Sequence, residues 1–226
     1  METTETLHAL AVTPPDPIGR GDGTGDAGGH PAAGTSPLLD VMVQLEETAA
    51  LDLIVDKAEG VVSPLLGSSG AKAILGGRWL GHAVHPLLTD LPIGFWTSAT
   101  VLDLVGGRRA ASAAQRLVGF GVLSAVPTAA TGWSDWLSLG RPLRRVGVVH
   151  AGANSAAIGL YALSWLARRK GHRARGVLLG LAGGTVASVA GHLGGHMTVG
   201  RGAGVLATED AMRAGAHGGG NRVTSW

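Results

Sequence analysis

The chain has no cysteine and little charge. Of its 226 residues, 15% are charged and 4% are aromatic. The lack of cysteine excludes disulfides, thiolate metal sites, cysteine-ligated iron–sulfur clusters and a cysteine nucleophile. A soluble domain carries about 25% charged residues, so the low charge argues against an ordinary soluble domain. The sequence also shows no nucleotide-binding loop, hydrolase triad or nucleic-acid-binding module, and nucleic acid is therefore not expected as a partner.

Charge is unevenly divided along the chain. Residues 1–80 contain eleven acidic and four basic side chains, whereas residues 81–226 contain five acidic and fourteen basic ones. Glycine is abundant throughout, with 38 residues. The division indicates two parts in different surroundings.

The N-terminal part divides into a tail and a helical segment. Residues 1–36 are rich in proline and glycine and are predicted to be a disordered tail, because they offer too few large apolar side chains to offset the ordering entropy. Residues 37–80 form a predicted amphipathic segment, with one helix over 37–66 and a short one over 71–75. Two interpretations are open for its apolar face: contact with the rest of the chain or the membrane interface, and contact with a partner protein.

Four apolar stretches follow, at residues 87–105, 112–133, 146–167 and 176–197. Each is about 20 residues long, which is the length of helix that crosses a hydrocarbon layer of about 30 Å. The predicted fold class is therefore all-α integral membrane: an antiparallel bundle of four transmembrane helices over residues 81–206, with a flexible tail over 207–226. Small residues recur every three or four positions in the third and fourth stretches, which favours close helix contacts in lipid.

The loops predict an orientation. The connectors between the first and second and between the third and fourth stretches hold eight basic residues, against five on the other side. The positive-inside rule then places both termini outside the cytoplasm of a multi-pass protein in a bacterial plasma membrane.

Polar side chains gather at the terminal side of the predicted bundle. Three helical stripes carry them: Ser124, Thr128, Thr131 and Asp135; His150, Asn154 and Tyr161; Thr185, Ser188, His192 and His196. Because lipid offers no hydrogen bonds, all three stripes are expected to face the bundle interior, together with His85 and Asp90. At the opposite side, Asp103 is expected to pair with Arg108.

Imidazoles on different helices at similar depth suit a b-type haem or a divalent metal ion. His150 and His192 match best in depth and are the predicted cofactor-binding pair, with His85 and His196 as alternates. A metal ion would use His150, His192 and His196. Asp90, Asp135 and Asn154 are expected to orient the imidazoles or carry protons. The alternative interpretation is that these histidines form structural hydrogen bonds between helices.

Four motifs carry a family resemblance. They are GHAVHPLLTDLPIGFW at 81–96, PTAATGWSDW at 127–136, RRVGVVHA at 144–151, and GHLGGHM at 191–197 followed by RGAGV at 201–205. In this order they resemble the bacterial predicted membrane proteins of domain-of-unknown-function family 2231, over residues 50–206. The resemblance implies a four-helix membrane bundle of unassigned biochemistry. Relatives are often fused to a Rieske ferredoxin-like domain, which these residues lack, so an electron partner would be a separate protein.

Two functions follow as hypotheses. The first is a membrane redox subunit that binds haem b, or less favourably a metal ion, through intramembrane histidines. The second is a non-catalytic membrane scaffold or assembly partner that uses its N-terminal helices. The expected partners are the lipid bilayer, a separate electron carrier or membrane complex, and a second copy of the chain.

Overall fold

The computed structural model describes residues 36–203, which are helical apart from short turns. The α-helices are α1 (Pro37–Glu47), α2 (Asp52–Leu66), α3 (Ser69–Leu75), α4 (Val84–Val105), α5 (Ala111–Trp136), α6 (Arg141–Arg169) and α7 (Arg173–Gly195). A 3₁₀ turn (Ala49–Leu51) precedes α2, and a π-helical turn (His196–Gly200) follows α7. The predicted all-α class is confirmed for this part of the chain. The predicted tails, 1–36 apart from Ser36 and 207–226, lie outside the described residues.

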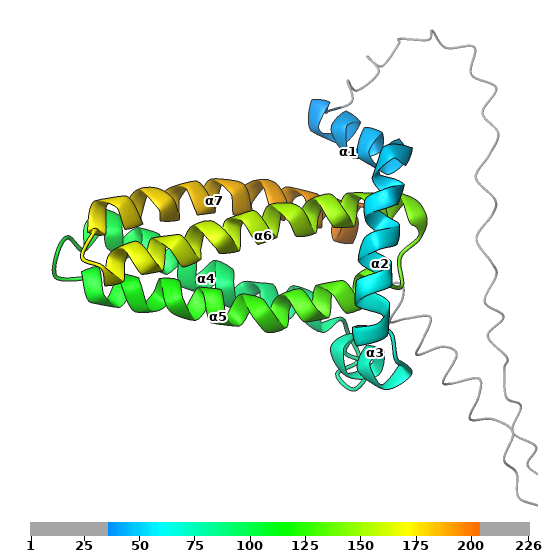
Figure 1. Ribbon diagram of the computed structural model, residues 1–226, viewed down its shortest axis with the longest axis horizontal. Coiled ribbons are helices and arrows are strands. Elements are labelled where there is room, and N and C mark those ends of the chain that lie inside the picture. The colour runs from blue at the N-terminus through cyan, green and yellow to red at the C-terminus, as the bar shows by residue number, and fades with distance from the viewer. Residues whose placement is uncertain (1–35, 204–226) are drawn as a thin grey trace, which may run out of the picture. The chain divides into compact units, whose positions relative to one another are not determined.

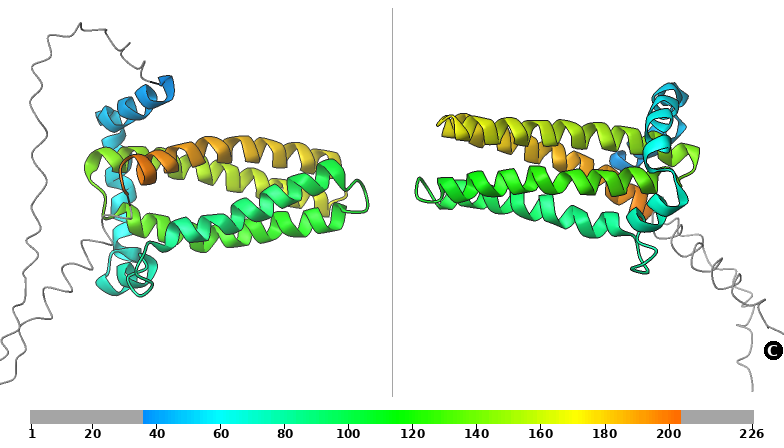
Figure 2. Two further views of the ribbon diagram at one scale, coloured as in Figure 1. Left: turned by 180° about the vertical axis from the view of Figure 1, so that it is seen from behind. Right: turned by 60° about the horizontal axis from the view of Figure 1, so that its bottom comes forward.

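Helices α4, α5, α6 and α7 lie side by side as an antiparallel group of four (Figures 1 and 2). The connectors are short, and those between α4 and α5 and between α6 and α7 each contain a glycine with positive φ, Gly107 at 56° and Gly171 at 80°. A residue with a side chain rarely adopts that conformation, so these glycines allow the tight reversals. The reversals bring the start of α4, the end of α5, the start of α6 and the end of α7 to one end of the group, hereafter the histidine end.

Three of these helices are long and apolar enough to cross a membrane by length and composition: α5, α6, and α7 continued to Gly200. The fourth, α4, is not among them, although the sequence predicts four spans. Asp90, Pro92 and Asp103 lie within α4 and lower its mean hydropathy. The expected bundle of four transmembrane helices is therefore confirmed only as far as three candidate spans.

Glycines let aromatic rings fill the narrow spaces between the long helices. The ring of Trp96 lies against Gly121, and the ring of Tyr161 lies against Gly183. A Cβ atom at either glycine would meet the ring, so the missing side chain makes room for it. At Gly159, which belongs to the predicted small-residue stripe of α6, a Cβ would meet nothing within 4 Å. The small-residue prediction is confirmed at Gly147, where a Cβ would meet the ring of Trp136, whereas Gly159 contacts no other helix among the described residues.

The N-terminal segment forms two helices where the sequence predicts one. The predicted helix over 37–66 is interrupted between Glu47 and Asp52, where Thr48 has an extended backbone. Helix α2 then crosses the ends of α5 and α6 (Figure 1). Its Val55 and Val62 are buried against Trp136 at the end of α5, Leu137 directly after it, and Val148 of α6.

Candidate functional site

His85 lies in the first turn of α4 and reaches across to α5. Its Nδ1 lies 2.9 Å from the backbone carbonyl oxygen of Thr128 and 3.3 Å from Oγ1 of Thr131. A carbonyl only accepts, so Nδ1 carries the proton and donates. The imidazole fits because Gly132 has no side chain, since a Cβ there would come within 2.7 Å of the ring. His85 therefore joins α4 to α5.

His150 joins α6 to α7 in the same way. Its Nδ1 donates to the carbonyl oxygen of Ala190 at 2.8 Å, and its Nε2 accepts from the amide of Asn154 at 3.0 Å. The ring lies against Gly194, where a Cβ would come within 2.9 Å of it. Both ring nitrogens are thus engaged by the protein, which leaves no free lone pair for an iron or metal ion.

His192 does not meet His150. It is exposed, whereas Ala190 and Gly194, on a different face of α7, lie against His150. The expectation that His150 and His192 face one space between helices is therefore wrong for this structure. Whether either residue binds a cofactor stays a prediction.

Three of the four residues of the third predicted polar stripe, Thr185, Ser188 and His192, face outward. Thr185 and Ser188 are exposed, and each hydroxyl donates to a carbonyl four residues earlier in α7, at 3.2 and 2.9 Å. These local hydrogen bonds satisfy the hydroxyls without a neighbouring helix. The small residues of α7 can then face α6, where close approach requires them. The other two stripes do face inward, with Thr128, Thr131 and Tyr161 buried.

His196 is held by the N-terminal segment. Its Nε2 lies 2.8 Å from Oε1 of Glu46 in α1, and Arg201 binds the same carboxylate at 2.8 and 3.0 Å. His196 follows His192 by four residues in the sequence. Its Nε2 is already bonded to Glu46, so this nitrogen is not free to bind a metal ion.

Neither of the two predicted carboxylates bonds to a histidine among the described residues. Asp90 is exposed on α4, and Asp135 lies near Gly76, at the end of α3. Neither carboxylate forms a hydrogen bond or ion pair within residues 36–203. Asp90 therefore does not face the bundle interior, contrary to the prediction. In the same part of the chain, no group of three or more histidine, aspartate or glutamate side chains is placed to hold a metal ion.

A groove runs between α1 and the end of α7. Its volume is about 440 Å³. It is lined by Ser36, Leu38, Leu39, Met42, Gly191, His192, Gly195, His196 and Val199. A Cβ at Gly191 or Gly195 would meet nothing within 4 Å. Most of the lining residues are apolar or glycine, so the groove is mostly apolar. Of its two imidazoles, His192 is the one with no protein partner among the described residues.

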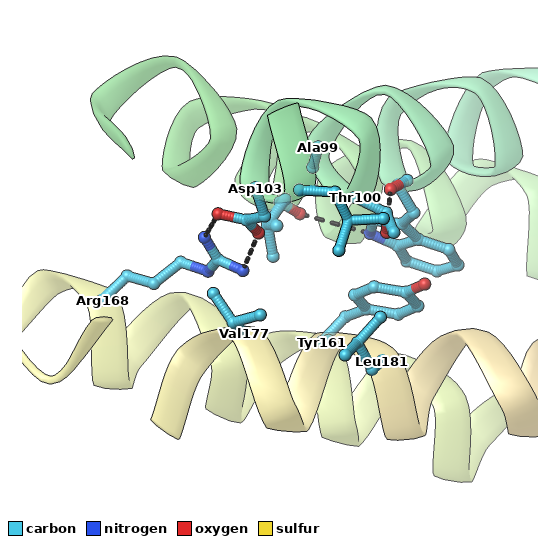
Figure 3. A pocket seen from close by; sticks show the side chains of 11 residues that line it. Ala99, Thr100, Asp103, Tyr161, Arg168, Val177 and Leu181 are labelled. Atoms are coloured by element: carbon cyan, nitrogen blue, oxygen red, sulfur yellow. Dashed lines mark hydrogen bonds and ion pairs between the residues drawn. The ribbon is translucent and has the colours of Figure 1, made fainter. Parts of the chain in front are cut away.

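The opposite end of the bundle holds a buried ion pair that sequence reasoning missed. Arg168 of α6 binds both carboxylate oxygens of Asp103 in α4, at 2.9 and 2.6 Å, and each side chain is 4% exposed (Figure 3). Arg173 approaches the same carboxylate at 3.4 Å. The predicted partner, Arg108, is exposed and forms no ion pair in residues 36–203, so that prediction is wrong. Helical register gives the missed signal, because Arg168 follows Tyr161 by seven residues and shares its face.

Aromatic rings cover this ion pair on its inner side. Trp96 and Tyr161 stack with ring centroids 4.0 Å apart and an angle of 7°, and Trp96 donates from Nε1 to the carbonyl of Val118. Between the stack and the ion pair lies a space of about 10 Å³. That volume holds about one water molecule and no larger ligand. The arrangement therefore serves packing and charge neutralisation.

Acidic side chains of α2 bind arginines among the first five residues of α6. This acidic stripe consists of Asp52, Asp56 and Glu59. The shortest nitrogen–oxygen distances are 2.8 Å between Arg145 and Asp52, 2.6 Å between Arg141 and Asp56, and 2.7 Å between Arg144 and Glu59. Opposite charges in the two parts of the chain therefore hold the N-terminal segment on the histidine end.

The strongest of these contacts is the fork between Arg145 and Asp52. Nε and Nη2 of Arg145 each donate to one carboxylate oxygen at 2.8 Å, and Nη1 donates to the carbonyl of Glu46. The hydrogen bond from Arg145, with the charges of Arg145 and Arg141, holds the pKa of Asp52 below its ordinary value. A lowered pKa in the folded state means that the pair stabilises the docked segment at neutral pH and stops doing so only in acid, as the pH falls through that pKa.

The comparison with known families supports the resemblance seen in the motifs. The model of the family DUF2231, described as a predicted membrane protein, matches residues 81–207, which is more than half of the chain. The chain belongs to the DUF2231 family. The match begins at α4, so the DUF2231 region is the four-helix group, and α1, α2 and α3 precede it. No curated protein and no solved structure matches the chain.

Proposed function

We propose that this DUF2231 protein is a non-catalytic membrane scaffold, whose bundle holds α1, α2 and α3 on its histidine end for assembly with other proteins. The observation that carries the proposal is the set of ion pairs between the acidic stripe and α6. These pairs fix a segment outside the family region in one position on the bundle. The interhelical bonds of His85 and His150 support the same role, because they use the imidazoles as structural links.

The scaffold requires that α4 crosses the membrane with the other three helices. The polar groups of α4 support this, because Asp103 is neutralised by Arg168 and Trp96 donates within the bundle. A charge that is paired inside the bundle costs less in lipid than an exposed one. The arginine-rich connectors lie at the end opposite the histidines, which favours a cytoplasmic position for that end in the bacterial plasma membrane.

Detaching the N-terminal segment tests the scaffold. Asp52→Arg faces Arg141 and Arg145 with a like charge, and is expected to release α2 and abolish recovery of proteins cross-linked to the wild type in native membranes. The charge swap Asp52→Arg with Arg145→Asp rebuilds the pair and is expected to restore that recovery. His192→Ala is the matched control, since the side chain is exposed. Unchanged recovery with Asp52→Arg, or its loss with His192→Ala, contradicts the scaffold.

The groove favours a second candidate, a redox subunit with one haem b. His150 does not fit as a residue that would hold the haem iron, because both of its ring nitrogens are engaged. His192 fits better, since it lines a groove of about 440 Å³ beside glycines that leave room for a flat ring. Met42 lines the same groove, and its thioether is another side-chain group that binds iron in haem proteins. A bound haem would supply one-electron chemistry, while His192 would hold its iron and the apolar walls would exclude water.

An absorption spectrum of the detergent-purified protein after haem addition tests this candidate. The wild type and His150→Ala are expected to show a Soret band, and His192→Ala is expected to lose it. Elemental analysis of the same sample tests the metal alternative. A wild type with neither a Soret band nor bound metal would eliminate the redox subunit and leave the scaffold.

A further inference from the structure

Helix α2 has a third face that the bundle leaves uncovered. Its apolar stripe consists of Ile54, Val61 and Leu65, which are 52%, 65% and 72% exposed. With 3.6 residues per turn, the acidic stripe lies to one side of the buried Val55 and Val62, and the apolar stripe lies to the other side. Three large apolar side chains in line on one face are costly to leave in water.

The ion pairs fix the direction of the apolar stripe. The acidic stripe is held by arginines among the first five residues of α6, which form the outermost part of that helix at the histidine end. Helix α2 runs across the ends of α5 and α6 (Figures 1 and 2). The apolar stripe, on the other side of the buried face, therefore points back along the bundle toward its middle.

The surface beyond that stripe is also apolar. On α5, Leu123 and Val126 are each 68% exposed, as expected for a helix surrounded by acyl chains. At the histidine end, Trp79 is 69% exposed and donates from Nε1 to the carbonyl of Ile74, with its ring left free. An amphipathic helix with charged groups toward water and apolar groups toward lipid is the form of an interfacial helix, and exposed tryptophan marks the same depth.

We propose that α2 lies in the membrane interface, with the apolar stripe among the acyl chains and the acidic stripe at the level of the lipid headgroups. The proposal rests on the membrane crossing in the proposed function and adds the lipid contact of a segment outside the family region. Lipid, and not a partner protein, is the occupant we assign to the apolar stripe, because the stripe points toward the part of the bundle where Leu123 and Val126 of α5 are exposed.

Nitroxide labels on single cysteines test this depth in vesicles of zwitterionic phospholipid. The chain has no cysteine, so each introduced one is unique. Labels at Ile54→Cys and Val61→Cys report the apolar stripe, Ser63→Cys on the exposed side near the acidic stripe is the matched control, and Val126→Cys is the reference inside the bilayer. The measured quantity is the collision rate with oxygen, which enters lipid, relative to a water-soluble nickel chelate.

The expected result is a shift of that ratio toward oxygen at Ile54, Val61 and Val126, and toward the nickel chelate at Ser63. If Ile54 and Val61 resemble Ser63 while Val126 favours oxygen, the interfacial helix is wrong and the membrane crossing stands. Shielding of Ile54 and Val61 from both reagents would mean that protein covers the apolar stripe, which also overturns the inference. If Val126 favours the nickel chelate, the membrane crossing itself fails.

Discussion

Replacing Arg168 with methionine should lower the free energy of unfolding of the bundle by about 3–5 kcal/mol, the usual effect of removing one partner of a buried ion pair. The carboxylate of Asp103 is 4% exposed and accepts two hydrogen bonds from Arg168, so the substitution leaves a buried charge with only the longer contact to Arg173. Unfolding by an anionic detergent in mixed micelles, followed by circular dichroism, measures the change.

The double substitution Asp103→Leu with Arg168→Met is the control. Apolar side chains of similar volume often replace a buried pair at no loss, because neither charge is then desolvated. The double variant is therefore expected to unfold closer to the wild type than either single variant. Equal stability of Arg168→Met and the wild type would show that the pair contributes nothing to the bundle. A double variant less stable than both single variants would contradict the charge argument.

Sequence patterns predicted the helices of this protein because hydropathy and helical period are local properties. The predicted apolar stretch at 146–167 lies inside α6. The turn at Gly107 separates α4 from α5, and the turn at Gly171 separates α6 from α7. The four predicted motifs also identified the family correctly. Such features need no knowledge of which face of a helix turns inward.

The arrangement of the candidate site depends on which face of each helix turns inward, and the sequence alone does not show this. Helix α7 has two faces with nearly the same spacing, one of small residues and one that carries Thr185, Ser188 and His192. The sequence favoured the polar face as the interior one, whereas close approach to α6 places the small face there. The predicted partner of Asp103 was wrong for a related reason, because Arg108 is near Asp103 in sequence whereas Arg168 is near it in space.

The same reasoning about faces gives opposite expectations for two glycines. Gly121→Ala puts a Cβ into the indole of Trp96, which is 6% exposed and stacked on Tyr161 and so cannot move aside freely. Overpacking of this kind lowers the free energy of unfolding by about 1–3 kcal/mol. Gly159→Ala adds a Cβ that meets nothing within 4 Å.

Because alanine is the better helix former, Gly159→Ala is expected to leave the free energy of unfolding unchanged or to raise it by up to about 1 kcal/mol. The same detergent titration measures both variants, and near-ultraviolet circular dichroism reports whether the indole has moved. A loss of the tryptophan signal in Gly121→Ala, with the signal kept in Gly159→Ala, would tie the destabilisation to Trp96. If Gly159→Ala destabilises as much as Gly121→Ala, then lipid or a neighbouring chain packs against α6 at Gly159, since no other side chain in residues 36–203 lies there.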